Sequence, residues 1–485
     1  MKIVLLPLDE RPCNSLFPKE LPLSNDIVLV LPPLELLSKM KKTCDIAKLH
    51  EWLINECKDA DYALIALDTL LYGGIVPSRL HHETLDTLQK RSEVLRVLKQ
   101  NNPKIKIFVN ELIMRTPCYS NSIEEPDYFD VCGRELWEYG YYLDKSLQNL
   151  LTGAEQEKMD ALYESLPKDH LKDLMDRREI NKQATLNNLK YILEGVIDYF
   201  IIPQDDCAPF GFTSIDRRAI RKFLVENQLA NKVLMYPGAD EAGLVLISKT
   251  LNDYYKKMPK VYIKYSYEDS KNFIPEFEDR PVDISLSEHL IIAGAERTYD
   301  YDSADMVLAV NVPNKEDKLL DFVNFLVISK NDNKVVGLSD VSYCNRGDLA
   351  LFEKLYEKDM LGTIDAYAGW NTSSNSTGTV IANMMAYFYS KDDEKKNLSL
   401  VSRYIEDVFY MGEVRNSVAE LVKEAGVKEF TTDNLEWGKK ELMTFVTSRF
   451  EDLSKKYELN KVYNAHEIKV YFPWNRIFEI GLLVK

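Results

Sequence analysis

The sequence predicts an α/β protein built from mainly parallel sheets with flanking helices. Short apolar runs recur along the 485 residues, and amphipathic segments separate many of them. The eleven apolar runs divide into six before residue 258 and five after it. Because six and five strands suit two separate open sheets, we expect two doubly wound, Rossmann-like lobes. A (β/α)8 TIM-like barrel with extra strands is the alternative fold.

The expected strands are short apolar runs, several of which end at a carboxylate. In the first lobe they cover residues 2–8, 26–32, 62–68, 105–111, 199–206 and 232–240. In the second lobe they cover residues 260–266, 289–295, 306–312, 335–341 and 364–370. Apolar residues at helical spacing predict helices over 46–57, 85–100 and 185–200.

These elements suggest three regions. An N-terminal α/β lobe is expected over residues 1–257, and a second α/β lobe over 258–390. The first lobe carries a charged, Tyr-rich insertion at 118–182, which we expect to be helical and to serve as a lid or an oligomer contact. Residues 391–485 are expected to be mostly helical and to return to the core through a strand-like segment at 470–484.

Composition excludes several classes of partner. The formal charge of -16 is spread along the chain, which disfavours nucleic acid and anionic membranes, since both attract basic surfaces. No stretch approaches the roughly 20 apolar residues of a membrane span, and Pro7, Asp9 and Glu10 interrupt the first apolar run too early for a signal peptide. The seven cysteines form no CxxC pair, so we expect no zinc ribbon, no disulfide scaffold and a reducing cytoplasm.

Carboxylates, amides and arginines follow many of the expected strands. Ligands of parallel sheets bind where the carboxyl ends of the strands meet, so these side chains predict one shared polar cleft. The expected substrate-binding residues are Asp9, Glu10, Arg11, Asp68, Tyr72, Arg79, Arg115, Asp340, Asn345, Asp348, Trp370, Asn371 and Asn375.

Several of these residues also have a structural interpretation. Asp240 and Asp348 are as well placed to cap the next helix as to bind a ligand. Arg79 and Arg115 are able to neutralise nearby aspartates in structural ion pairs. Trp370 suits the core as well as it suits a platform for a sugar ring.

The segment YFIIPQDDCAPFG at 199–211 places two adjacent carboxylates, Asp205 and Asp206, at the end of a buried strand. Neighbouring carboxylates raise the pKa of one member of the pair. Hydrolysis of a glycosidic bond needs one protonated and one ionised carboxyl group. We therefore expect Asp205 and Asp206 to be catalytic, with a partner from Glu111, Asp240 or Glu241.

The motifs together resemble a bacterial family of unknown function, DUF4127. The matching segments are PLDERP (7–12), LDTLLYGGIVPSR (67–79), NELIMRTP (110–117), PQDD (203–206), GADE (238–241), SDVSYCNRGD (339–348), GWNTSSNSTGT (369–379) and PWNRIFE (473–479). They run from residue 7 to residue 479, so the resemblance implies membership over the full chain. It implies little chemistry, because the family name records no activity.

A second likeness covers only PQDD and GWN. A strand that ends in Asp-Asp, with Trp-Asn at a later strand end, looks like the arrangement in some barrel enzymes that remove N-acetylhexosamines. This likeness is an analogy between sites. It favours a carbohydrate substrate.

The expected function is therefore a glycosidase-like hydrolase that acts on a small molecule or an oligosaccharide and needs no cofactor. One alternative is an Mg²⁺- or Mn²⁺-dependent sugar isomerase or phosphoester hydrolase, because hard cations bind carboxylates. Another is a carbohydrate- or metabolite-binding protein without catalysis. Cys207 is a poor nucleophile, because the neighbouring carboxylates raise the pKa of its thiol. We expect no metal ligands, and a homo-oligomer is compatible with the insertion.

Overall fold

The structure is a computed structural model that describes residues 1–313, 318–426 and 439–484. The chain divides into two compact units, each of which uses several segments. The first unit contains Met1–Glu10, Val28–Gly243 and Phe277–Arg280, and the second contains Arg11–Ile27, Leu244–Glu276 and Pro281–Lys485. After the short segment Arg11–Ile27, the second unit begins at Leu244, whereas the sequence predicted its start at residue 258. The described residues after 391 belong to the same unit as the second sheet.

The first unit contains a six-stranded parallel sheet with strand order β2-β1-β3-β4-β5-β6. The chain runs from β1 to β2 on one side, and from β3 to β6 on the other side, as in a doubly wound fold. The six strands match the six runs predicted before residue 258. They are β1 (Lys2–Leu6), β2 (Val28–Val30), β3 (Tyr62–Ala66), β4 (Lys106–Asn110), β5 (Tyr199–Gln204) and β6 (Val233–Pro237).

Burial of apolar side chains explains the first sheet. The inner strands β3, β4 and β5 consist almost entirely of buried residues, as expected for parallel strands that are covered on both faces. Helix α3 (Ile46–Glu56) turns Leu49 and Leu53 toward the core, and its N-cap Asp45 accepts a hydrogen bond from Lys48 N at 3.2 Å. The remaining helices of this unit are α4 (Leu67–Tyr72), α5 (Ile75–Leu80), α6 (Leu85–Ser92), α7 (Val94–Asn101), α8 (Phe129–Leu147), α9 (Gly153–Ser165), α10 (Lys168–Asn188), α11 (Lys190–Leu193) and α12 (Phe212–Glu226).

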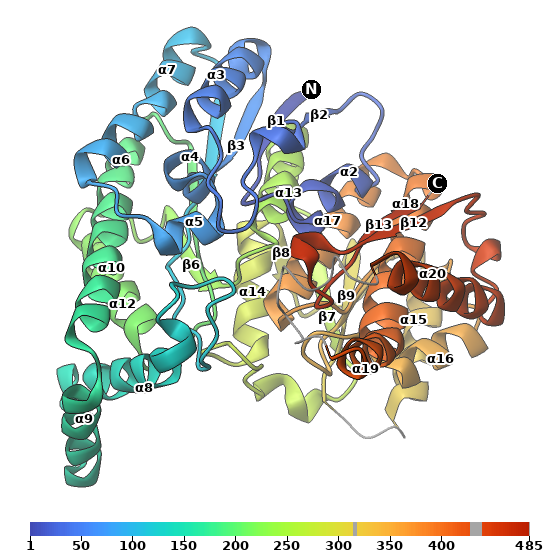
Figure 1. Cartoon of the computed structure of the whole chain (residues 1–485). Helices are drawn as coiled ribbons and strands as arrows, with labels where there is room; N and C mark the ends of the chain where they lie inside the picture. Colours follow the sequence, from blue (N-terminus) through green and yellow to red (C-terminus); the bar gives the residue numbers. More distant parts are fainter. Residues whose placement is uncertain (314–317, 427–438, 485) are drawn as a thin grey trace. The chain divides into compact units, whose positions relative to one another are not determined.

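The helical prediction for the insertion is confirmed, because α8, α9 and most of α10 occupy residues 129–182. In Figure 1, α10 runs beside α6 and α12, and it contacts both of these helices. The single helix predicted over 85–100 is two helices, α6 and α7, joined at Glu93. The helix predicted over 185–200 is wrong at its end, because α11 stops at Leu193 and β5 starts at Tyr199.

The second unit contains a five-stranded parallel sheet with strand order β11-β10-β9-β7-β8. Its strands are β7 (Lys260–Tyr265), β8 (Glu296–Thr298), β9 (Met306–Asn311), β10 (Val335–Asp340) and β11 (Ala366–Ala368). The two separate sheets confirm the prediction of two doubly wound lobes, and they exclude the alternative of one barrel. The helices of this unit are α1 (Pro12–Ser15), α2 (Phe17–Glu20), α14 (Val282–Ile292), α15 (Leu319–Asn331), α16 (Leu349–Glu357), α17 (Ser373–Ser390), α18 (Asp393–Arg403), α19 (Arg415–Glu424) and α20 (Lys439–Lys456).

Helix α13 (Ala242–Tyr255) leads from the first unit into the second. The strand predicted at 289–295 is wrong, because His289–Ile292 form the last turn of α14. A short apolar run does not distinguish a strand from a buried helical turn. The strand of this region is instead β8 at one edge of the sheet, whose sequence Glu-Arg-Thr lacks the apolar pattern of a strand.

The C-terminal segment forms a two-stranded antiparallel hairpin of β12 (Ile468–Tyr471) and β13 (Gly481–Val484), in place of one strand over 470–484. The segment PWNRIFE connects the two strands. Residues 427–438 and 485 of the predicted C-terminal region lie outside the described residues. The described part of this region is mostly helical, with the π-helix η5 (Tyr404–Val414) between α18 and α19.

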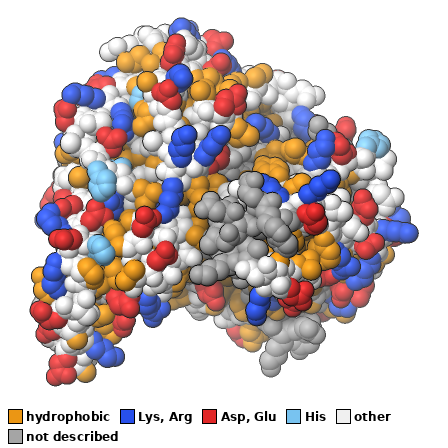
Figure 2. Space-filling model, in the orientation of Figure 1, with side chains coloured by type: hydrophobic (Ala, Val, Ile, Leu, Met, Phe, Trp, Pro, Cys, Tyr) orange, Lys and Arg blue, Asp and Glu red, His pale blue; other side chains and the backbone are white. Residues whose placement is uncertain are grey.

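No helix in the described part of the chain has the length and apolar character needed to span a membrane. On the face drawn in Figure 2, acidic and basic side chains are interspersed.

Candidate functional site

The strand ends of the first sheet bring polar side chains to its carboxyl edge. Arg79 follows β3 on α5, Arg115 follows β4, and Asp205 and Asp206 follow β5 directly. Because β3, β4 and β5 are neighbours in the sheet, these side chains meet although they are far apart in the sequence.

Two glycines form the connection between α4 and α5, the helix that carries Arg79. Gly73 has φ 88° and Gly74 has φ 146°, which favour glycine. A Cβ atom at Gly73 would lie 2.2 Å from Thr43 Oγ1, and one at Gly74 would lie 2.6 Å from Ser38 Oγ. The pair therefore forms a tight turn against a neighbouring loop.

Arg79 binds three carboxyl groups. Its Nη2 donates to Asp205 Oδ2 at 2.6 Å, and its Nη1 contacts Glu124 Oε2 at 3.0 Å and Glu125 Oε1 at 3.5 Å. Only 3% of the Arg79 side chain is exposed. A short hydrogen bond from a guanidinium group to a carboxyl group is a strong contact, so Arg79 fixes the position of the Asp205 side chain.

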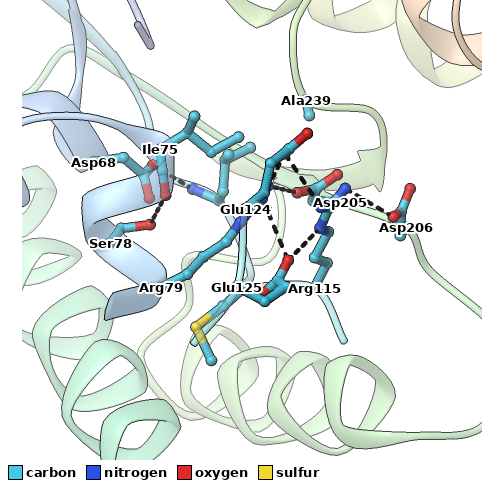
Figure 3. A network of polar contacts seen from close by, with 12 residues as sticks. Asp68, Ile75, Ser78, Arg79, Arg115, Glu124, Glu125, Asp205, Asp206 and Ala239 are labelled. Atoms are coloured by element: carbon cyan, nitrogen blue, oxygen red, sulfur yellow. Dashed lines mark hydrogen bonds and ion pairs between the residues drawn. The ribbon is translucent and has the colours of Figure 1, made fainter. Parts of the chain in front are cut away.

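Arg115 completes the group from the other side (Figure 3). Its Nη1 donates to Asp206 Oδ2 at 3.2 Å, its Nε to Glu125 Oε1 at 2.8 Å and its Nη2 to Glu124 Oε2 at 3.2 Å. We call the six side chains the carboxylate–arginine cluster. Its members are Arg79, Arg115, Glu124, Glu125, Asp205 and Asp206.

The cluster has four carboxyl groups for two guanidinium groups. Burial raises the pKa of Asp206 to about 7; Arg115 opposes this shift and the neighbouring Asp205 adds to it. Burial also raises the pKa of Glu125, and both arginines oppose that shift. The cluster is therefore expected to hold a proton near neutral pH, on Asp206 in particular.

The backbone of Asp206 is unusual as well. Its φ is 40°, in the left-handed region that few residues other than glycine, asparagine and aspartate adopt. The Asp206 side chain is 16% exposed, whereas that of its partner Arg115 is 11% exposed. Backbone strain of this kind is often found at functional sites.

Asp68 and Glu111 form a second buried pair of carboxyl groups in the first unit. Asp68 Oδ2 accepts from Leu112 N at 3.0 Å, and Asn188 Nδ2 lies 3.0 and 3.1 Å from the two oxygens of Glu111. Burial raises the pKa of Asp68 to about 6 and that of Glu111 to about 8, where the charge of Asp68 adds to the shift. The hydroxyl of Tyr72 is buried and makes no hydrogen bond within the described residues.

Two other predicted residues of the first unit, Glu241 and Glu10, accept hydrogen bonds from loop residues. Glu241 Oε2 accepts from Ala239 N at 2.9 Å. Glu10 accepts from Ser38 Oγ at 2.7 Å and from Met40 N at 2.6 Å. Asp9 and Asp240 are buried at the ends of β1 and β6. Their predicted roles in binding or catalysis stay predictions.

The second unit has its own polar group at the ends of β9 and β10. Asn311 Nδ2 donates to Asp340 Oδ1 at 2.9 Å and to Asp348 Oδ2 at 3.2 Å. Asp340 Oδ2 accepts from Asp348 N at 2.6 Å and from the Tyr367 hydroxyl at 2.8 Å. Burial raises the pKa of Asp340 to about 7, and the charge of Asp348 adds to this shift. Asp348 also caps α16 through Ala350 N, as its structural interpretation predicts.

The remaining predicted residues of this unit lie on nearby loops. Asn345 N donates to Asn371 O at 2.8 Å, and both residues have positive φ. Asn375 Nδ2 donates to Thr372 Oγ1 at 2.9 Å. The buried Arg11 guanidinium lies 4.7 Å from the centroid of the Trp474 ring.

Trp370 is enclosed in the second unit. Only 3% of it is exposed, its ring meets the edge of Phe17 with centroids 5.3 Å apart, and its Nε1 donates to Thr379 Oγ1 at 3.1 Å. This environment agrees with the core interpretation.

The predicted site residues thus lie in two units. Those from Asp9 to Glu241 belong to the first unit, apart from Arg11, and those from Asp340 to Asn375 belong to the second. The prediction that all of them share one cleft stays a prediction. Within the described residues, no group of three or more His, Cys, Asp or Glu side chains is arranged to hold a metal ion.

Sequence reasoning missed Glu124, Glu125 and Asn188. The two glutamates lie in the expected insertion, where the sequence analysis assigned no site residues. The adjacent pair Glu124-Glu125, shortly after Arg115, was the available signal. Asn188 gave no signal, because its role depends on where α10 packs.

Comparisons with known proteins give one extensive match. A family model described as "Protein of unknown function (DUF4127)" matches residues 3–483. No curated protein matches the chain. Among solved structures, Phytolacca americana UGT2 in complex with UDP-2fluoro-glucose and pterostilbene is similar at 10% sequence identity, covering 83% of this chain and 94% of that chain, with a TM-score of 0.18. A likeness at this TM-score says nothing about activity.

Proposed function

The chain belongs to the DUF4127 family, and because that family's description names no activity, we propose from the site alone that the protein is a hydrolase of glycosidic bonds. The observation that carries the proposal is the unequal environment of Asp205 and Asp206 at the end of β5. Arg79 holds Asp205 through a 2.6 Å hydrogen bond, whereas the pKa of Asp206 is raised to about 7. Adjacent carboxyl groups in unequal environments suit acid–base chemistry.

In this proposal Asp206 is the proton donor. It transfers its proton to the glycosidic oxygen as the bond between that oxygen and the anomeric carbon breaks. The ionised Asp205 stabilises the positive charge that develops on the sugar. Water then adds its hydroxyl to the anomeric carbon and returns its proton to Asp206.

Arg115 and Glu125 position the donor. Arg115 binds both Asp206 and Glu125, so it fixes the Asp206 carboxyl relative to the rest of the cluster. Arg79 has the same relation to Asp205. These arginines therefore act through the carboxyl groups, and they are positioning residues in this proposal.

The Mg²⁺ or Mn²⁺ enzyme remains the alternative proposal. The described residues do not fit such an ion, because no three carboxylate, histidine or cysteine side chains are arranged so that they could bind one metal ion together. We derive no step through a metal.

The leaving group tests the proposal. Hydrolysis of aryl glycosides is measured for the wild type and for Asp206→Asn. The substrates carry a panel of sugars and one of two leaving groups, nitrophenol or dinitrophenol, of which dinitrophenol is the better leaving group. Loss of a general acid should slow nitrophenyl substrates by about 10²–10⁴-fold, and dinitrophenyl substrates much less, because the latter need little protonation. Asp176→Asn, on the exposed side of α10, is the matched control and should keep full activity.

Equal rates for the wild type and Asp206→Asn would contradict the assignment of the donor. Failure to hydrolyse any aryl glycoside in the panel would contradict the proposed reaction. Activity that disappears in excess chelator and returns with Mn²⁺ would favour the metal enzyme.

A further inference from the structure

The second sheet has a point where its connections change direction. The chain passes from β7 to β8 on one side and from β9 through β10 to β11 on the other side. The carboxyl ends of β7 and β9 therefore flank the switch point of this sheet. Open α/β sheets bind their ligands at such positions.

A groove lies at the end of β7, between that strand and α15. Its volume is about 520 Å³, within the range of sites that take small molecules. One wall comes from Lys264 and the residues that follow β7, and the other comes from the flank of α15. We call it the α15 groove, and all its lining residues belong to the second unit.

The helical wall presents one face of α15. Asp321, Asn324, Phe325 and Ile328 are three, four and seven positions apart, so they lie in a row along the helix. Asp321 and Ile328 are exposed, and Asn324 and Phe325 are half-buried. The wall therefore combines hydrogen-bonding groups with an apolar surface.

The aromatic part of this wall is held in place from behind. The Phe325 ring packs against Tyr301 at 5.6 Å and Tyr262 at 6.3 Å between centroids. On the strand side, Lys264 Nζ lies 5.4 Å from the Phe325 centroid and contacts Glu268 Oε1 at 3.3 Å. Phe325 is therefore a fixed apolar side chain in the lining of the groove.

The charges of the groove have both signs. Lys264 and Lys318 are basic, and Glu268, Asp269 and Asp321 are acidic. An anionic ligand would meet three carboxylates, and a cationic ligand would meet two ammonium groups. A neutral ligand with many hydroxyl groups meets no such repulsion, because each hydroxyl donates to a carboxylate and accepts from an ammonium or amide group.

We infer that the α15 groove binds a neutral saccharide, with a pyranose face against Phe325 and hydroxyls bound by Asp321, Asn324 and Lys264. The carboxylate–arginine cluster belongs to the other unit, and none of its residues lines the α15 groove. The inference does not depend on the proposed hydrolysis, and it holds equally for a binding protein without catalysis.

The test uses glucose, maltotriose, cellotriose and chitotriose as neutral probes, with glucuronate and glucosamine as charged comparators. Saturation-transfer NMR and titration calorimetry measure binding to the full chain. At least one neutral saccharide should bind, and Asn324→Ala and Asp321→Ala should each weaken it by about fivefold or more, as expected for loss of one to two hydrogen bonds to a ligand. Leu320→Ala, on the same helix but outside the groove, should leave binding unchanged.

Three results would overturn the inference. The first is that no neutral saccharide binds the wild type. The second is binding that both Asn324→Ala and Asp321→Ala retain at wild-type strength, which would place the sugar elsewhere. The third is preferential binding of glucuronate or glucosamine that both variants abolish. Asp206→Asn should bind as the wild type does, so failure here and failure of the proposed hydrolysis are distinguishable.

Discussion

Arg79 Nη2 donates a 2.6 Å hydrogen bond to Asp205 Oδ2 across 126 positions of the sequence. This contact joins α5, which follows β3 in the chain, to the end of β5. It makes Asp205 part of a buried ion-pair network as well as a candidate catalytic group. The two roles predict different consequences for the two aspartates.

Asp205→Asn should lower the melting temperature by several degrees at pH 8, whereas Asp206→Asn should leave it unchanged or raise it. Loss of the Asp205 charge weakens the neutralisation of buried Arg79, which costs about 1–3 kcal/mol, although Glu124 and Glu125 still bind that arginine. Asn mimics the protonated Asp206, the form that burial favours. Thermal melts of both variants give the comparison.

An equal loss of stability in both variants would show that Asp206 acts as a structural partner of Arg115. The proposed proton donor would then be wrong. The candidate site would move to Glu111 and the loop that contains Asp240 and Glu241.

Glu111→Gln should change the pH dependence of stability. The pKa of Glu111 is raised from 4.5 to about 8 in the folded protein. Between these values the native state keeps a proton on Glu111 that the unfolded chain releases. The stability that Glu111 contributes is therefore complete below about pH 4.5 and is lost as the pH rises through 8. Wild type should lose stability relative to Glu111→Gln between these values.

Melts at intervals from pH 4 to pH 9 measure that difference. Glu157→Gln, at an exposed position of α9, is the control and should run parallel to the wild type. A constant difference between Glu111→Gln and the wild type across this range would show that Glu111 is ionised in the folded protein.

Trp370→Ala should destabilise the second unit by about 3–5 kcal/mol, the usual cost of removing a buried aromatic ring. The ring contacts Phe17, and its indole N–H is bound by Thr379. Denaturant unfolding measures the loss. Trp137→Ala is a suitable comparison, because that ring is half-exposed and should matter less. Unchanged stability together with lost saccharide binding would favour the sugar-platform role.

Gly238→Ala should destabilise the first unit by about 1 kcal/mol or more. Gly238 has φ 151°, and an added Cβ would lie 2.0 Å from Glu241 Oε1, so the loop that Glu241 holds must move. Gly243→Ala is the matched control, since its Cβ would meet only Leu5 at an ordinary 3.5 Å and helix α13 favours alanine. Equal melting temperatures for the two variants would contradict the close approach of Glu241.

The fold class followed from local pattern. Runs such as YALIA and MVLAV are continuously apolar, a composition typical of strands that are buried on both faces of a sheet. The prediction failed where the pattern was ambiguous. HLII has the same apolar composition whether it ends a helix or forms a strand, and the edge strand Glu296–Thr298 has too little burial to leave an apolar signature.

The candidate residues at the strand ends also followed from the sequence, because a carboxylate after a buried run is visible without coordinates. Which of them are paired was decided by tertiary structure alone. The contacts of Arg79 with Asp205, of Asn188 with Glu111 and of Asn311 with Asp340 depend on strand order and helix packing. The desolvation of Asp206 was also decided by tertiary structure. The sequence shows that Asp206 has a charged neighbour, but only the packed structure removes water from its carboxyl group, and this burial raises its pKa to about 7.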